Sequence, residues 1–316
     1  MIHARGVWAA ALAARVASRR PWVKVLYDVR GDYVAEHAFH RAGRGDATGL
    51  RIRAGQWRIG RAEARACAAA TRLLCVSEAL RATLEARYPG AGVKAAVVPS
   101  GHDPRRFFLD PELRARTRAS LGLADAFVLV YAGSMVPYQL PGSLARMGRI
   151  ASELDPQAHL LILTQDPEVA RGFLKRAGVP EGRATCLRVP HAEVPAYLSA
   201  ADLGLLLRRR DPVNQAASPT KVAEYLASGV PVLLSPEIGD TSALVVKEGL
   251  GAVVDDPESP RALREALRDL LARGLPAREH VARVARQRFA RDRFLPTYLD
   301  LYGQLSLAAQ RGATAR

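Results

Sequence analysis

Residues 127–134 read FVLVYAGS, an unbroken apolar run that ends abruptly in small and polar residues. A strand covered by helices on both faces has such a run, because neither face meets water. Similar short runs recur along the chain and alternate with longer stretches that have helical character. This alternation predicts an α/β protein with parallel sheets, and 316 residues are enough for two such domains.

The second domain begins with this run and is predicted to span residues 109–290. Its further strands are expected at residues 159–163, 185–189, 203–207, 230–234 and 252–254. Its helices are expected at residues 142–154, 169–177, 194–200, 221–227 and 260–273. Residues 104–124, rich in Pro, Arg and Asp, are expected to form the crossing between the two domains.

The first domain is predicted to span residues 1–108 and to include a C-terminal helix at 291–316. Its expected strands are residues 23–27, 72–76 and 95–98, its expected helices are residues 56–70 and 78–87, and residues 2–5 suggest a strand end. A complete Rossmann-like lobe has more strands than this. We therefore expect the first lobe to be short at its amino-terminal side.

The charge of the chain is positive and uneven. The net charge is +15, and residues 1–108 hold 19 Lys/Arg against 8 Asp/Glu. A basic lobe attracts anions, which leaves open a phospholipid surface or a lipid-linked phosphate acceptor. The 3 Trp, 9 Tyr and 7 Phe are not interleaved with the basic runs, so we expect no nucleic-acid partner.

Apolar runs of about 20 residues, the length of a membrane span, do not occur in the sequence. We expect a cytoplasmic protein, with peripheral attachment at the inner face of the membrane as an open alternative. The basic segment at residues 51–65, which contains Trp57, is the candidate for that contact, although it also suits the solvated face of a long helix. The three cysteines, Cys67, Cys75 and Cys186, have no metal-like spacing.

Residues 218–233 read SPTKVAEYLASGVPVL and carry the strongest functional signal. Ser218 is predicted to cap a helix whose first residue is Pro219. Lys221 and the exposed backbone N–H groups there suit a diphosphate. Glu224 lies about one turn further on the same face, where its carboxylate can accept hydrogen bonds from two ribose hydroxyls.

This motif resembles the donor-site signature of glycosyltransferase family 4, whose members have the GT-B fold of two Rossmann-like lobes, and five other segments agree with the family in order and spacing. The supporting segments are LLCVSEAL followed by VVPSGHDPRRF, then FVLVYAGSMVPYQ, VPAYLSAADLGLLL and GLGAVVDDPESPRAL. The resemblance runs from His3 to about Tyr302. It implies a retaining hexosyltransferase that needs no metal or cofactor and takes a nucleotide-diphosphate sugar as donor.

The resemblance also implies which residues do what. The donor binds the second lobe, and the acceptor, a glycan or a lipid-linked or small molecule, binds the first. The expected catalytic residues are Arg208, Lys221 and Asp28. The expected donor-binding residues are Gly133, Ser134, Gln139, Arg188, Pro190, His191, Asn214, Ser218, Pro219, Thr220 and Glu224. The expected acceptor-side residues are His3, Arg5 and Arg30.

The sequence departs from the family pattern at two places. Many relatives carry two glutamates with seven residues between them, and the first falls at Ala216 here. Many relatives also carry an arginine after the glycine of the phosphate turn and a lysine some residues later, where this chain has Ser134 and residues 138–140. Arg208, its two neighbouring arginines or Lys221 must then supply the missing charge.

Three alternatives stay open at this point. A GT-B-fold sugar-nucleotide epimerase would need an acid/base pair, for which the sequence offers no clear candidate. A nucleotide-sugar-binding subunit without catalysis would fit the two departures and the short first lobe. A basic nucleic-acid-binding protein would bind oligonucleotides with strong salt dependence. The sequence does not predict the donor nucleotide, the acceptor or the oligomeric state.

Overall fold

The computed structural model describes residues 1–42 and 49–314, which form two compact units. Unit 1 comprises Met1–Ser100, Asp211–Ser218 and Arg293–Arg316, and unit 2 comprises Gly101–Arg210 and Pro219–Asp292. The sequence predicts the division after residue 108, whereas the structure has it after Ser100. Asp211–Ser218, expected in the second domain, belongs to unit 1. Residues 315–316, the end of the predicted C-terminal helix, lie outside the described residues.

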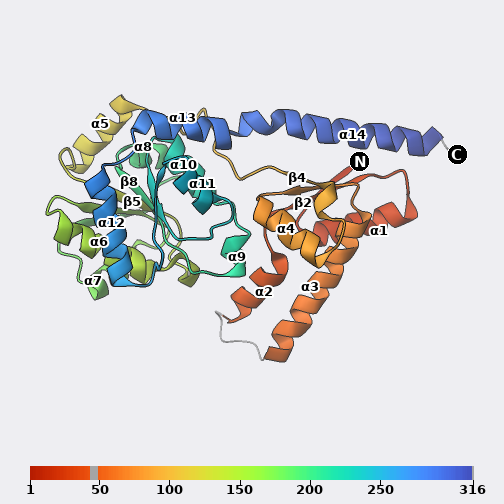
Figure 1. Ribbon diagram of the computed structural model, residues 1–316, viewed down its shortest axis with the longest axis horizontal. Coiled ribbons are helices and arrows are strands. Elements are labelled where there is room, and N and C mark those ends of the chain that lie inside the picture. Colours follow the sequence, from red (N-terminus) through yellow and green to blue (C-terminus); the bar gives the residue numbers. More distant parts are fainter. Residues whose placement is uncertain (43–48, 315–316) are drawn as a thin grey trace. The chain divides into compact units, whose positions relative to one another are not determined.

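Unit 1 is a parallel four-stranded sheet in the order β1-β2-β3-β4 (Figure 1). Its elements are β1 (Ile2–Arg5), α1 (Val7–Arg19), β2 (Val25–Val29), α2 (Tyr33–Ala42), α3 (Gly49–Ala69), β3 (Arg72–Cys75), α4 (Glu78–Arg87), η1 (Gly92–Lys94), β4 (Ala95–Val97), α9 (Pro212–Gln215) and α14 (Leu295–Thr314). One face of the sheet packs against α1, α3 and α4. The other face packs against α14 through Leu26, Leu74 and Leu305.

Unit 2 is a parallel six-stranded sheet in the order β10-β9-β8-β5-β6-β7. Its elements are α5 (Pro111–Leu121), β5 (Val128–Ala132), η2 (Pro137–Gln139), α6 (Pro141–Leu154), β6 (His159–Leu163), α7 (Pro167–Ala177), β7 (Ala184–Leu187), α8 (Val194–Ser199), β8 (Leu203–Leu206), α10 (Thr220–Ala227), β9 (Val232–Leu234), α11 (Thr241–Lys247), β10 (Gly251–Val253), α12 (Pro260–Arg273) and α13 (Arg278–Phe289), followed by η3 (Arg291–Phe294) at the border with unit 1. The predicted α/β architecture of two parallel-sheet lobes is confirmed.

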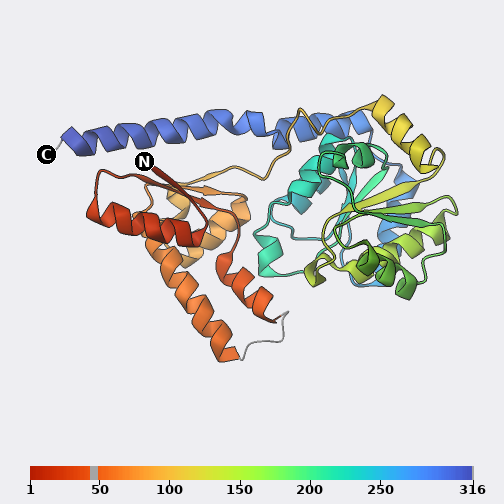
Figure 2. The same cartoon turned by 180° about the vertical axis from the view of Figure 1, so that it is seen from behind.

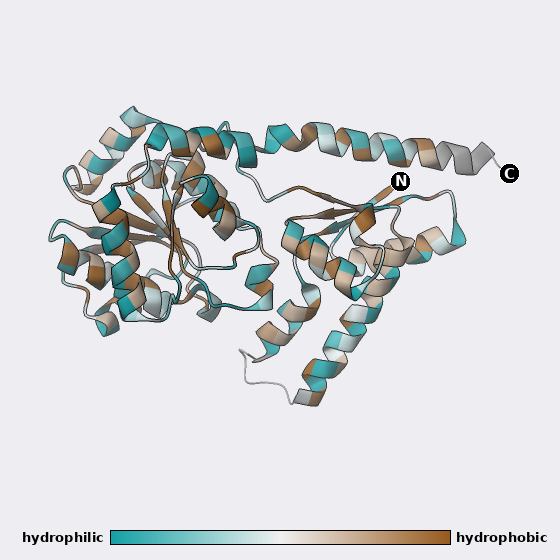
Figure 3. Ribbon diagram, in the orientation of Figure 1, coloured by the Kyte–Doolittle hydropathy of each residue, from teal (hydrophilic) through white to brown (hydrophobic). Residues whose placement is uncertain are grey.

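The apolar run that begins at Phe127 forms β5, whose side chains alternate between two hydrophobic clusters. Val128 and Val130 pack on one face of the sheet with α10 and α13. Leu129 and Tyr131 pack on the other with α6, α7 and α12, and Figure 2 shows these layers from behind. Figure 3 shows brown, apolar strands beneath helices of mixed polarity. The continuous run is therefore explained by burial on both faces.

Two sequence observations have structural counterparts. The three cysteines are buried thiols without disulfide partners among the described residues. Within residues 1–42 and 49–314, we find no helix with both the length and the apolar composition needed to span a lipid bilayer.

The segment expected as a simple crossing contains helix α5, which the sequence pattern missed. Asp202 anchors this helix, since its carboxylate accepts hydrogen bonds from Arg114, from Arg118 at 3.1 Å and from the backbone N–H of Val128 at 2.8 Å. Arg118 is 8% exposed and also donates to carbonyl oxygens. Arg114 and Arg118 thus belong to a largely buried ion-pair network rather than to a solvated linker.

Replacing Asp202 with alanine leaves the Arg118 guanidinium buried without its counter-ion. We expect Asp202→Ala to lower the free energy of unfolding by about 3–5 kcal/mol, as for other broken buried pairs. Urea unfolding followed by circular dichroism measures this. The control is Asp269→Ala on α12, where Asp269 pairs with exposed Arg268 at 3.5 Å and the change should be within about 0.5 kcal/mol. Equal effects of the two substitutions would refute the anchoring role.

Candidate functional site

A pocket of about 300 Å³ opens in unit 2 at the carboxyl ends of its central strands. It lies beside the point where the strand order reverses, between β5 and β8, and open parallel sheets bind ligands at such points. The residues that line it come from the ends of β5 and β6, the segment after β7, α8 and α10: Ala132, Gly133, Ser134, Leu163, Thr164, Gln165, Val189, His191, Val194, Lys221 and Glu224.

Gly133 allows the side chain of Lys221 to enter this pocket. A Cβ at Gly133 would lie 1.9 Å from Lys221 Nζ, and real contacts of this kind do not occur. The ammonium group lies 5.0 Å from the centre of the Tyr131 ring, a cation–π distance. The glycine turn after β5 therefore leaves space for the ammonium group of Lys221.

Tyr225 ties α10 to the end of β5. Its hydroxyl accepts a hydrogen bond of 2.8 Å from the backbone N–H of Ala132. Its ring packs against Gly204 of β8, where a Cβ would lie 2.6 Å from a ring carbon. Tyr225 is fully buried, so the helix that carries Lys221 and Glu224 has a fixed position over the strand ends.

The cations near this site, Lys221 and Arg208, are half-buried, and burial opposes their charge. Burial, and then the neighbouring Arg208 guanidinium, lowers the pKa of Lys221 to about 8. Burial also lowers the pKa of Arg208, whose guanidinium lies 5.8 Å from the centre of the Tyr138 ring. A bound dianion would stabilise both charges, so the arrangement suits a phosphate-bearing ligand.

Glu224 is the one carboxylate among the residues that line this pocket. Burial raises its pKa, and the positive charges of Arg291, Lys221 and Arg106 oppose that rise. A half-buried carboxylate one turn after a lysine can accept hydrogen bonds from hydroxyl groups while the lysine faces an anion. Lys221 and Glu224, which the sequence predicts on one helical face, do meet in one pocket.

The arginines after β8 divide into two kinds. Arg208 is half-buried, and its backbone N–H donates to Ser235 Oγ. Arg209 and Arg210 are exposed and form ion pairs with Glu258 and Glu237. Arg208 is thus the arginine of this run that lies close enough to Lys221 to shift its pKa.

Backbone groups of the turn after β5, where the family pattern has its phosphate turn, already have hydrogen-bond partners within the protein. The backbone N–H of Gly133 donates to the carbonyl of Leu163 at 2.8 Å, so it already has a partner. The carbonyl of Ser134 accepts a hydrogen bond from the Tyr131 hydroxyl at 2.7 Å. Gln139 is 2% exposed and does not line the pocket, and its Oε1 has no hydrogen-bond partner among the described residues.

The predicted helix cap at Ser218 is wrong. The helix begins at Thr220, Pro219 occupies the capping position without a side-chain hydrogen bond, and Ser218 Oγ instead accepts the backbone N–H of Ser100 within unit 1. Asn214 also belongs to unit 1 and is buried there. Asn214, Ser218, Pro219 and Thr220 do not line the pocket of unit 2.

Ala216, where many relatives have a glutamate, is buried in the hydrophobic cluster of unit 1. Its carbonyl accepts a hydrogen bond of 2.9 Å from Ser77 Oγ. A carboxylate in such apolar surroundings would be unfavourable without a partner. The local packing of this chain is therefore adapted to the small residue.

His191, like Val189, belongs to the segment after β7 and lines the pocket. Its carbonyl accepts a hydrogen bond of 2.7 Å from Arg106, and its ring meets the Phe107 ring edge-on at 6.4 Å. Arg188 and Pro190 are exposed and do not line the pocket, whereas Val189 between them does. Thr164 and Gln165 also line the pocket and were not predicted, although they follow a predicted strand as Gly133 does.

The acceptor-side candidates meet in unit 1. β1 and β2 pair in parallel with Arg5 opposite Asp28. Asp28 is 6% exposed, and its carboxylate oxygens lie 3.8 Å from His3 Nε2, 4.0 Å from Arg5 Nε and 3.7 Å from Arg30 Nη1. His3 Nδ1 lies 2.9 Å from the Tyr302 hydroxyl of α14. One carboxylate thus has three basic neighbours at ion-pair distance.

Two parallel α/β lobes, one with a cationic pocket at its topological switch point, define the class of GT-B-like glycosyltransferases. A family model described as "Glycosyl transferases group 1" matches residues 114–288, more than half of the chain. The chain belongs to this family.

Individual glycosyltransferases are similar to this chain at low sequence identity. A D-inositol 3-phosphate glycosyltransferase of Kineococcus radiotolerans is 28% identical over 78% of this chain and 61% of its own length. A GDP-mannose-dependent alpha-(1-6)-phosphatidylinositol monomannoside mannosyltransferase of Mycolicibacterium smegmatis is 30% identical over 55% of this chain and 46% of its own. The sucrose-phosphate synthase structure from Thermosynechococcus elongatus superposes with a TM-score of 0.76 at 20% identity, over 97% of this chain and 74% of that one. This chain thus spans less than two thirds of the length of the curated relatives.

The contact between Gly133 and Lys221 can be tested by adding one methyl group. We expect Gly133→Ala to displace the ammonium group and to weaken binding of nucleoside diphosphates about tenfold to a hundredfold, the usual range for a lost charged hydrogen bond. Calorimetric titration measures this. Gly142→Ala is the matched control, because its nearest neighbour would be 3.8 Å away. Equal affinities of the two variants would refute the role of Gly133.

The lowered pKa of Lys221 predicts a pH dependence. Below pH 8 the ligand-free protein carries the charge, and above it the ammonium loses its proton before a diphosphate arrives. Affinity for nucleoside diphosphates should therefore fall as pH rises through about 8. Titrations from neutral to alkaline pH measure this, and Lys221→Met should bind weakly with a flat profile. An unchanged slope in that variant would contradict the assignment.

Proposed function

We propose that this chain transfers a hexose-type sugar from a nucleotide-diphosphate sugar to an acceptor, with retention of anomeric configuration. The carrying observation is that Lys221 and Glu224 enter one pocket from one helix at the switch point of a parallel sheet. Membership of the glycosyl transferases group 1 supports it. The names of the two curated relatives, a glycosyltransferase and a GDP-mannose-dependent mannosyltransferase, agree with this class.

In this proposal the leaving diphosphate lies against Lys221 and Arg208. As the bond from the sugar carbon to the diphosphate oxygen breaks, negative charge grows on that oxygen. Two pre-positioned cations in a half-buried site stabilise this charge more in the transition state than in the ground state. They supply the charge that Ser134 and the residues after it lack, and the reaction we propose requires no metal or cofactor.

The remaining roles follow from the same pocket and from unit 1. Glu224 accepts hydrogen bonds from the ribose hydroxyls of the donor, and the segment around His191 borders the nucleobase. In unit 1, we assign Asp28 with His3, Arg5 and Arg30 to the acceptor, a glycan or a lipid-linked or small molecule. A carboxylate among three basic groups can order hydroxyl and phosphate groups of such an acceptor.

A panel of UDP-, GDP- and dTDP-sugars tests the donor assignment. We expect one nucleotide class to raise the melting temperature and to release free sugar slowly. Glu224→Ala should abolish the stabilisation, because the ribose loses its hydrogen-bond acceptor. Glu168→Ala, at an exposed position of α7, is the matched control and should behave like the unchanged protein.

Two other outcomes would count against the proposal. Stabilisation without turnover, also with a range of acceptors present, would favour a binding subunit without catalysis, as the departures at Ser134 and Ala216 suggest. If no nucleotide sugar stabilises the protein, the donor site at Lys221 and Glu224 is wrong.

A further inference from the structure

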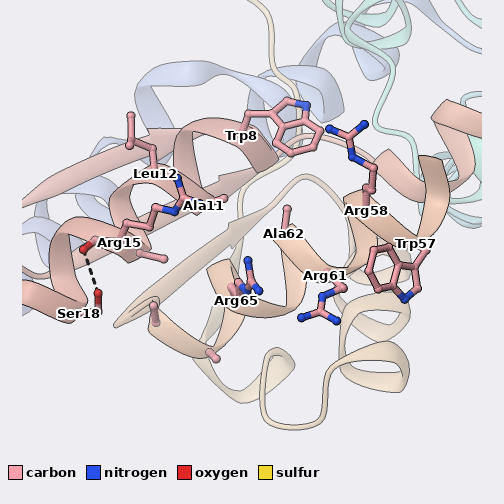
Figure 4. A pocket seen from close by; sticks show the side chains of 13 residues that line it. Trp8, Ala11, Leu12, Arg15, Ser18, Trp57, Arg58, Arg61, Ala62 and Arg65 are labelled. Carbon is pink, nitrogen blue, oxygen red and sulfur yellow. Dashed lines mark hydrogen bonds between the residues drawn. The ribbon is translucent and has the colours of Figure 1, made fainter. Parts of the chain in front are cut away.

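A second, larger hollow lies in unit 1, between the outer sides of α1 and α3. It measures about 860 Å³ and has no part in the proposed transfer reaction. We call it the α1–α3 groove, and its larger side chains are Trp8, Leu12 and Arg15 from α1 and Trp57, Arg58, Arg61 and Arg65 from α3 (Figure 4). Smaller residues, mostly alanines, complete the lining.

The apolar side chains of the groove are unusually exposed. Trp8, Leu12 and Trp57 are 59%, 63% and 62% exposed. Below them, Val7, Ile59 and Ala62 form a small buried cluster that joins the two helices. The helices are therefore held together by an inner layer, while large apolar side chains remain outside. Such a patch on a surface marks an interaction site.

The charges around the groove have one sign. Helix α1 carries two arginines and no acidic residue, and α3 carries five arginines and one acidic residue, Glu63. Glu63 is fully buried, where the hydroxyls of Tyr27 and Tyr88 donate to its carboxylate. Among the described lining residues there is no carboxylate. The groove thus offers exposed arginines with no opposing charge of its own.

The aromatic and cationic groups also lie on one face. Trp57, Arg61 and Arg65 are spaced by four residues along α3, and the Arg61 guanidinium lies 4.8 Å from the centre of the Trp57 ring. Trp8, Leu12 and Arg15 have the same kind of spacing on α1. Indole rings favour the boundary between lipid head groups and acyl chains, and arginines bind lipid phosphates.

We propose that the α1–α3 groove docks unit 1 on the surface of an anionic phospholipid bilayer. Trp8, Leu12 and Trp57 enter the interfacial layer, and the arginines bind head-group phosphates. The charge complementarity favours this occupant, because a neutral apolar partner would leave the arginines unmatched. The docking is independent of the donor pocket, so either proposal can fail without the other.

Vesicle co-sedimentation of the full chain tests the docking. We expect binding to vesicles of phosphatidylcholine mixed with phosphatidylglycerol and little binding to phosphatidylcholine alone, with loss at high salt. The triple variant Arg58→Gln/Arg61→Gln/Arg65→Gln should reduce partitioning roughly a hundredfold, given about fivefold for each arginine at such a surface. The control Arg171→Gln/Arg261→Gln/Arg268→Gln makes the same charge change on exposed helices of unit 2 and should bind normally.

Tryptophan fluorescence reports the insertion directly. The chain has 3 Trp, so Trp22→Phe leaves Trp8 and Trp57 as the reporters. We expect a blue shift with anionic vesicles and quenching by brominated acyl chains. Both effects should be absent in Trp8→Ser/Trp57→Ser, which keeps Trp22 as its fluorophore and should have unchanged circular dichroism. Equal loss in the two arginine variants, equal binding to both vesicle types, or binding of oligonucleotides without vesicle binding would overturn the proposal.

Discussion

The candidate site depends on the absence of a side chain at Gly133. Because β5 is buried on both faces, its end is fixed in position, and the next residue determines what can approach the strand. Lys221 Nζ lies 1.9 Å from where the Cβ of any other residue would be, which is too close for both atoms. Tyr225 fixes the helix that carries this lysine through its bond to the Ala132 N–H. The core packing of the sheet thus determines where the cation of the pocket lies.

Two half-buried cations, Lys221 and Arg208, bear on the departure from the family pattern at Ser134. Burial lowers the pKa of both Lys221 and Arg208, and the Arg208 guanidinium adds to the shift at Lys221, so the surroundings oppose these positive charges in the ligand-free protein. An anionic ligand beside them would stabilise both positive charges, which favours binding of such a ligand. This chain has Ser134 where the family pattern has an arginine after Gly133, and we propose that Arg208 and Lys221 supply the missing charge.

The sequence predicts the regular elements well and the local contacts less well. The strand at residues 159–163 and the helix at 260–273 match the structure to the residue, because their hydrophobic periodicity is strong. Helix α5 is missed because its buried arginines resemble linker composition. Ser218 fails as a cap because its hydroxyl bonds Ser100, which is distant in sequence. Thr164 lines the pocket because β6 lies next to β5 in the sheet, and the order of strands in a sheet cannot be read from local sequence patterns.

We propose that Glu224 holds the ribose of a donor nucleotide in the pocket of unit 2. The most direct measurement is a thermodynamic cycle that combines Glu224→Gln with 2′,3′-dideoxy forms of the nucleoside diphosphate that binds. The account predicts that the substitution weakens the ribonucleotide about tenfold or more, the range of a lost charged hydrogen bond, and leaves affinity for the dideoxy form unchanged. Equal weakening of both nucleotides would contradict it.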